Sequence, residues 1–108
     1  MNNQYYIILG SNKAIGEFLG KQMKVLKGSV ISSTNKSSFR KIEERNANIE
    51  KYTELKGDLL VVKEDVVFST PSAAAVFCTG RNTNGWLEWK NSDGISLDII
   101  ERRSRDKF

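Results

Sequence analysis

Residues 68–80 read Phe68-Ser69-Thr70-Pro71-Ser72-Ala73-Ala74-Ala75-Val76-Phe77-Cys78-Thr79-Gly80, and they predict a short helix with both ends marked. Thr70 can cap this helix, because a threonine hydroxyl accepts a hydrogen bond from a backbone N–H of the first turn. Pro71 suits the first helical position, where its fixed φ fits and no N–H is needed. Gly80 ends the helix, since glycine readily adopts the left-handed conformation found at helix C-termini. We therefore expect a helix over Pro71–Thr79.

The segment after this helix predicts a turn followed by a strand. Asn84-Gly85 is a turn signal, and the aromatic segment Trp86–Lys90 has the composition of a strand. On a strand, Trp86 and Trp89 would lie on opposite faces. We expect one tryptophan to anchor the core and the other to be available for stacking on a base. Beyond a second turn, Ser96–Arg103 predicts a last helix.

Upstream, short apolar runs predict strands, and one longer segment has helical spacing. The helical segment is Ser37–Lys56, which Gly57 would end. The predicted strands are Gln4–Leu9, Lys24–Lys27, Leu59–Val62 and Val66–Phe68. Strands and helices that do not alternate regularly indicate an α+β fold. We expect one domain over residues 1–108, with a small mixed or antiparallel sheet packed against two to three helices.

Composition narrows the class of protein. Hydrophobic residues make up 39% of the chain, which is enough for a core, and the single cysteine excludes an intramolecular disulfide. There is no signal-peptide leader and no apolar run long enough to span a membrane, so we expect a cytoplasmic protein without a membrane partner. The net charge is +4, with basic ends and an acidic middle. If the two basic ends of the chain meet in space, they would form a positive face that attracts phosphates. An equally good interpretation is that these charges only keep the protein in solution.

Catalysis and metal binding are not expected. The chain has no histidine, so the usual general base and the commonest metal ligand are missing, and one cysteine cannot build a zinc site. Cys78 falls inside the predicted helix beside apolar residues, which favours a buried hydrophobic role. The stretch Gly10–Gly16 has some likeness to a dinucleotide loop, but Ala14 stands where a glycine would be needed. We therefore expect no enzyme activity and no cofactor.

The helix start and the downstream turn form the candidate binding site. Hydroxyls at a helix N-terminus, beside free N–H groups and the positive dipole end, suit an anion. Arginine and asparagine pair with bases or phosphates, and tryptophan stacks on bases. The assigned roles are an anion site for Ser69, Thr70 and Ser72, polar readout for Arg81, Asn82 and Asn84, stacking for Trp86 or Trp89, and a phosphate contact for Lys90. The structural alternative is that these residues cap helices, form turns and pack.

Residues 70–90 resemble the signature of an uncharacterised domain family found at the C-terminus of GIY-YIG nucleases and in restriction-system proteins. That signature runs Ser-Pro-Ser-Ala-Ala-Ala, then a glycine, then Asn-Gly-Trp-x-x-Trp-Lys. The matching residues are Pro71–Ala75, Gly80, Asn84–Trp86, Trp89 and Lys90. Thr70 replaces the usual serine and keeps a hydroxyl, whereas Phe77-Cys78 replaces a small aliphatic pair.

The resemblance extends over about residues 14–103 and leaves 104–108 as a basic tail. Val25–Ser29 is similar to a Val-Leu-Lys-Gly-Ser segment of that family, and Gly94 with Leu97 is similar to its Gly-x-x-Leu. The signature also resembles that of the RAMA domain, which is proposed to read modified DNA. The resemblance implies a DNA-binding accessory domain in restriction, in anti-phage defence or in its evasion. The alternative is a mobile-element or phage protein that binds a small nucleotide or a defence-system protein.

Overall fold

The first two strands form a hairpin that begins the larger of two sheets. The computed structural model describes residues 4–35 and 42–103. In it, β1 (Gln4–Leu9) pairs with β2 (Asn12–Phe18) in antiparallel register, with Gln4 opposite Glu17 and Leu9 opposite Asn12. The prediction of β1 is confirmed with the same bounds. Strand β2 was not predicted; it includes most of the glycine-containing stretch that has some likeness to a cofactor loop.

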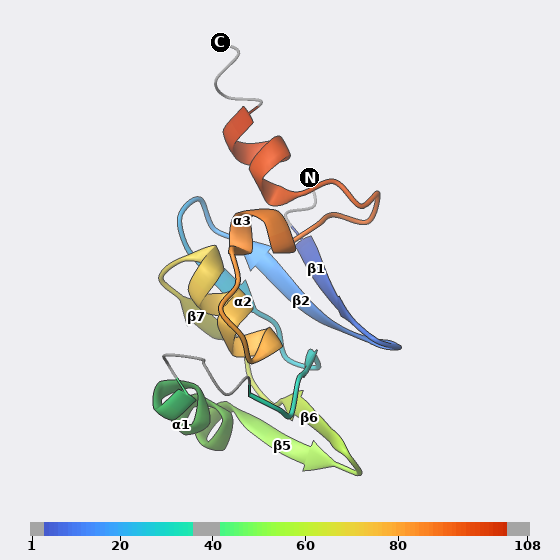
Figure 1. Cartoon of the computed structure of the whole chain (residues 1–108), viewed down its shortest axis with the longest axis vertical. Helices are drawn as coiled ribbons and strands as arrows, with labels where there is room; N and C mark the ends of the chain where they lie inside the picture. The colour runs from blue at the N-terminus through green and yellow to red at the C-terminus, as the bar shows by residue number, and fades with distance from the viewer. Residues whose placement is uncertain (1–3, 36–41, 104–108) are drawn as a thin grey trace.

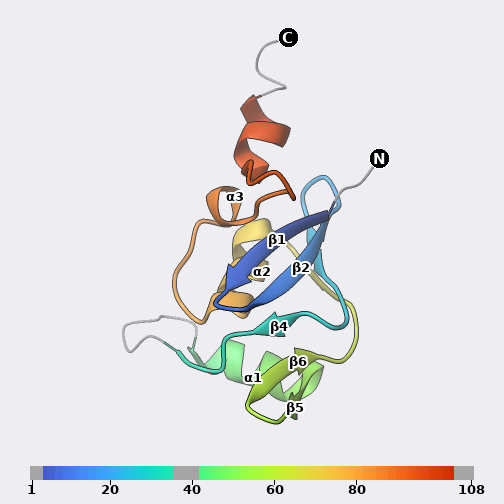
Figure 2. The ribbon, with the colours of Figure 1, turned by 90° about the vertical axis from the view of Figure 1, so that its right-hand side faces the viewer.

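The larger sheet has the order β1-β2-β3-β7, and all its pairs are antiparallel. Strand β3 (Met23–Val25) is shorter than predicted, and β7 (Val66–Phe68) has the predicted bounds. Alternate residues of these strands point into the core, which places Tyr5, Ile7 and Ala14 on the inner face. Figure 2 views β1 and β2 from the outer side, with α2 behind them. Over β1 and β2, no helix of residues 4–35 and 42–103 covers the outer face of this sheet.

The smaller sheet has the order β4-β6-β5 and lies at the end of the molecule away from the last helix (Figure 1). Its strands are β4 (Val30–Ile31), β5 (Thr53–Lys56) and β6 (Leu59–Val62). The prediction that the helix continues to Lys56 is wrong, because helix α1 (Ile42–Tyr52) ends where β5 begins. Gly57, with φ +64°, occupies the tight turn between β5 and β6. The predicted helical residues 37–41 lie outside the described part of the chain.

Helix α2 (Pro71–Thr79) is confirmed with its predicted bounds and caps. The Thr70 hydroxyl accepts a hydrogen bond from the Ala73 N–H at 3.0 Å. Gly80 ends the helix in the left-handed conformation, and its N–H donates to the Val76 carbonyl. The inner side of α2 buries Ala74, Ala75, Phe77 and Cys78 against the core. This face of α2 therefore combines small residues with the Phe77 ring where it packs against the core.

The predicted strand over Trp86–Lys90 is wrong, because most of it is a short helix, α3 (Gly85–Glu88). Asn84 caps this helix, since its side-chain oxygen accepts a hydrogen bond from the Trp86 N–H at 3.0 Å. The spacing of Trp86 and Trp89 matches one helical turn, which directs both side chains toward the core side. Within the predicted strand, Lys90 makes isolated antiparallel bridges, one with Tyr6 of β1 and one with Ser96.

The last element is a helix with π-type geometry, η1 (Asp98–Arg103), within the helix predicted over Ser96–Arg103. Leu97, which precedes it, is fully buried, and Ile100 packs against the core. The fold is α+β, as expected, with antiparallel pairing throughout. The described chain has two sheets in place of the single sheet expected. No helix in residues 4–35 or 42–103 is long and apolar enough to span a membrane.

Alkaline pH should destabilise the fold through Tyr5. Burial, and then the Glu101 carboxylate that accepts its hydroxyl at 3.4 Å, raise the pKa of Tyr5 from 10.0 to about 12. The unfolded chain releases this proton at lower pH, so stability falls between pH 10 and about 12. In that window the stability of the wild type should fall more steeply with rising pH than that of Tyr5→Phe, which has no ionisable hydroxyl. Urea unfolding of both proteins from pH 8 to 11.5 measures this difference, and parallel pH profiles would contradict it.

Candidate functional site

Trp89 joins the sequence signature to the core. Its side chain is fully buried, and its Nε1–H donates to the Pro71 carbonyl at 3.0 Å. Its ring passes so close to Gly16 that a Cβ added there would lie 2.9 Å from two ring carbons. Trp89 is therefore the tryptophan that anchors the core, as predicted of one of the pair. It has no exposed surface with which to stack on a base.

Gly85 and Ser72 complete the contact between α2 and α3. The Ser72 hydroxyl accepts a hydrogen bond from the Gly85 N–H at 2.9 Å. A Cβ on Gly85 would lie 2.2 Å from the Pro71 carbonyl oxygen, so only glycine fits there. We name the interlocked set Pro71, Ser72, Gly85 and Trp89 the α2–α3 clasp. Ser72, assigned from sequence to an anion site, has a structural hydrogen bond in the clasp.

The other downstream site residues are partly engaged within the fold. Trp86 is half-buried and meets the Phe18 ring edge-on, with centroids 5.6 Å apart. The Arg81 guanidinium donates to the Glu88 carboxylate at 2.9 Å and to the Thr83 hydroxyl at 2.8 Å. Asn84, assigned to polar readout, directs its side-chain oxygen to the α3 cap.

Residues 5–101 match DUF4357, which is described as a domain of unknown function. The chain belongs to the DUF4357 family. The match runs from β1 to η1 and includes the α2–α3 clasp. No curated protein and no solved structure matches the chain.

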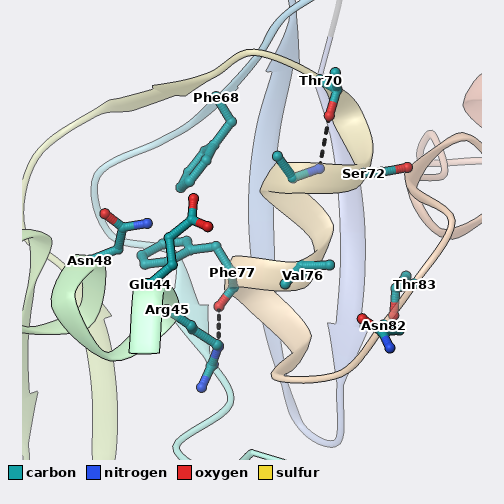
Figure 3. Close-up of a pocket in the computed structure, with 11 residues that line it drawn as sticks. Glu44, Arg45, Asn48, Phe68, Thr70, Ser72, Val76, Phe77, Asn82 and Thr83 are labelled. Atoms are coloured by element: carbon teal, nitrogen blue, oxygen red, sulfur yellow. Dashed lines mark hydrogen bonds between the residues drawn. The ribbon is translucent and has the colours of Figure 1, made fainter. Parts of the chain in front are cut away.

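The DUF4357 domain has a groove along the outer side of α2, which we call the α2 groove (Figure 3). Its volume is about 310 Å³. One wall comes from α1 and the other from the segment after α2. The lining residues are Glu44, Arg45, Asn48, Phe68, Thr70, Ser72, Ala73, Val76, Phe77, Asn82 and Thr83. The structure thus brings Thr70, Ser72 and Asn82 of the predicted site to one groove. Ser69, Arg81, Asn84, Trp86, Trp89 and Lys90 do not line it.

Arg45 is a buried residue that contributes to the lining of the α2 groove. It was not singled out from the sequence. It is 2% exposed, and its Nε–H donates to the Phe77 carbonyl at 3.0 Å. Its other donors reach the Ser32 and Thr34 carbonyls and the Asn35 side chain. Burial lowers the pKa of Arg45. No carboxylate pairs with Arg45 among the described residues, so a sequence search for charge pairs would not find it.

The outer face of the larger sheet carries a second grouping of polar residues, which we call the basic face: Tyr6, Lys13 and Lys90. Tyr6 and Lys90 are bridge partners, so their side chains leave the sheet on the same side. The Lys13 ammonium lies 4.9 Å from the centre of the Tyr6 ring. All three line one depression of about 480 Å³, together with residues of the 91–94 turn. Lys90 was assigned from sequence; Tyr6 and Lys13 were not, because β2 was not predicted.

The single cysteine of the chain, Cys78, lies in the core of the DUF4357 domain. Burial raises the pKa of the Cys78 thiol well above its usual range, while Arg45 lowers it by a smaller amount. The thiol is therefore uncharged at neutral pH and enclosed in the core. Within residues 4–35 and 42–103, no three acids or cysteines are grouped so that they could hold a metal ion. The basic tail, residues 104–108, lies outside the described part of the chain.

Proposed function

We propose that this DUF4357 chain is a non-catalytic DNA-binding domain that contacts the phosphate backbone through its basic face. The observation that carries the proposal is the convergence of Lys13 and Lys90 on Tyr6 in one depression. Lysines supply the salt-dependent attraction to phosphates, and the half-buried ring of Tyr6 beside them can pack on a sugar or base.

The surrounding surface supports this proposal. Glu88 also lines the depression, but its carboxylate is paired with Arg81 at 2.9 Å, which offsets its charge. Ile8, on the same outer face, is 69% exposed and extends the surface with an apolar contact. The α2–α3 clasp holds Lys90 against β1, so the clasp positions one of the two lysines.

The resemblance noted from sequence gives this binding a context. Domains with a similar signature accompany GIY-YIG nucleases and restriction-system proteins, and the RAMA domain is proposed to read modified DNA. We propose an accessory role of this kind, in restriction, in anti-phage defence or in its evasion, for a protein of the cytoplasm. The alternative is a protein that inhibits host defence by binding a small nucleotide or a partner protein. In that case the binding surface would lie outside the basic face.

The salt dependence of DNA binding tests the proposal. Each phosphate contact contributes about 0.9 to the slope of log affinity against log salt on duplex DNA. The double variant Lys13→Gln/Lys90→Gln should therefore bind a 20-base-pair duplex more weakly, with a slope reduced by about 1.8. Fluorescence anisotropy from about 50 to 200 mM salt measures both quantities.

The matched control is Lys21→Gln/Lys63→Gln, which removes the same charge from two exposed lysines outside the basic face. Its slope should stay within a few tenths of the wild-type value. Equal losses in the two double variants would mean that binding follows net charge only, and the proposal would fail.

A further inference from the structure

The α2 groove presents several polar groups that have no partner among the described residues. Glu44 and Asn48 of α1 lie on one wall, and Asn82 lies on the other. Figure 3 shows the Glu44 carboxylate directed toward the side of Phe68, with the Asn48 amide beside it. None of these three side chains has a hydrogen bond or ion pair within residues 4–35 and 42–103. The groove therefore offers one carboxylate and two amides to a ligand.

The charge of the groove argues against a phosphate. Arg45 lines it, but its guanidinium is directed to the Phe77, Ser32 and Thr34 carbonyls. Glu44 is then the one described ionised group free to face the ligand. A carboxylate repels phosphate and accepts hydrogen bonds from N–H groups. The ligand should thus be a neutral or cationic donor, which differs from the anion site expected from sequence.

The apolar part of the groove suits a flat ring. Phe68 is half-buried and packs against Phe77 with the ring centres 5.0 Å apart. Figure 3 places the Phe68 ring above the Glu44 carboxylate. Ala73 and Val76 of α2 complete a small apolar floor. A volume of about 310 Å³ is at the lower end of the range for small-molecule sites.

We propose that the α2 groove binds an amino-bearing nucleobase, such as adenine or cytosine. The ring would pack on Phe68, the exocyclic amino group would donate to Glu44, and the amides of Asn48 and Asn82 would bond the ring edge. Carboxylates accept from base amino groups, asparagine amides pair with base edges, and unstacked bases pack on phenylalanine. The proposal does not depend on the basic face, because Tyr6, Lys13 and Lys90 do not line the groove.

Titration with uncharged nucleosides tests this proposal without any phosphate contact. Adenosine and cytidine should bind the full chain at least tenfold more tightly than uridine, which has no amino group. Glu44→Gln should weaken adenosine binding by about tenfold, because the amide oxygen that replaces the carboxylate is an uncharged and weaker acceptor. Calorimetry or ligand-observed NMR gives the dissociation constants.

Glu50→Gln is the matched control, since it removes the same charge from an exposed position of α1 that does not line the groove. It should bind adenosine like the wild type. Equal binding of uridine and adenosine, equal loss in the two glutamate variants, or no binding of any nucleoside would overturn the proposal.

An oligodeoxyadenylate distinguishes a free nucleoside from a base within a strand. Tighter binding of the oligonucleotide than of adenosine, with the same loss in Glu44→Gln, assigns the groove to a base of a single strand. Equal binding assigns it to a free nucleoside, and either result keeps the base as the ligand. The Lys13→Gln/Lys90→Gln variant should bind adenosine normally, so a failure of the DNA proposal can be told apart from a failure of this one.

Discussion

Trp89→Ala should destabilise the protein by about 3–5 kcal/mol, the range measured for truncating buried aromatic side chains. The substitution removes a fully buried indole, which packs against Gly16 and donates to the Pro71 carbonyl. It leaves a cavity between β2 and α2, together with a buried carbonyl that has lost its partner. Since small domains are stable by only about 5–15 kcal/mol, most of the folding free energy would be lost. Urea denaturation followed by circular dichroism measures the change.

Trp89→Phe separates the contribution of ring packing from that of the indole hydrogen bond. It keeps most of the ring volume and removes the Nε1–H donor, so it should cost about 1–3 kcal/mol. A Trp89→Ala protein as stable as the wild type would show that the clasp does not hold α3 to the core.

Arg45→Met should destabilise the protein by about 2–4 kcal/mol. Methionine replaces the aliphatic stem but removes the donor to the Phe77 and Ser32 carbonyls and to the Asn35 side chain. The Thr34 carbonyl also loses Arg45 but still accepts from the Ser32 hydroxyl. Each buried acceptor that loses its partner costs about 1–3 kcal/mol, although water reaches the less buried ones. Removing the desolvated charge offsets part of this loss, because burial already disfavours the ionised guanidinium. We expect the orphaned acceptors to outweigh that gain.

Two variants calibrate the Arg45 result. Arg45→Lys keeps the charge, but a single ammonium group cannot reach all the acceptors that surround the planar guanidinium. The lysine variant should therefore lose nearly as much stability as Arg45→Met. Arg81→Met removes an arginine that is 44% exposed and paired with Glu88, and it should cost about 0–1 kcal/mol. If Arg45→Met proved no more damaging than Arg81→Met, the buried hydrogen bonds of Arg45 would contribute nothing to stability.

The sequence was most informative where local chemistry alone determines the structure. The start of α2 depends on Thr70 and Pro71 and its end on Gly80, and these preferences act within a few residues. Strand β1 was equally clear, because a short aromatic and β-branched run has few alternatives. Strand β1 is an edge strand of the larger sheet and contacts α2. The α+β class followed from the irregular order of strands and helices along the chain.

The errors arose where tertiary contacts decide the conformation. Trp86–Lys90 has the composition of a strand, but the Asn84 cap and the contact of Gly85 with Pro71 favour a helical turn. Thr53–Lys56 continues a helical pattern, but pairing with β6 makes it a strand. Arg45 was not singled out from the sequence. Its burial depends on carbonyls far away in sequence, which no local pattern reveals.

The candidate site was predicted only in part, because tertiary contacts also decide which surface each of its residues reaches. Residues of one continuous signature were taken to form one surface, whereas the fold divides them among the clasp, the α2 groove and the basic face. Lys90 reaches the basic face because it pairs with Tyr6, a partner 84 positions earlier in the numbered sequence. Residues such as Ser72 and Trp89 support these surfaces from within the fold.

Backbone NMR during a duplex DNA titration tests the central claim most directly, because it maps where DNA contacts the chain. Duplex DNA keeps its bases paired, so it should leave the α2 groove unoccupied. We predict that at about 50 mM salt the amide signals of Tyr6, Lys13 and Lys90 shift together and saturably, while those of Glu44 and Asn48 stay in place. Binding of the duplex without shifts at Tyr6, Lys13 and Lys90, or no binding at this salt concentration, would contradict the assignment of DNA binding to the basic face.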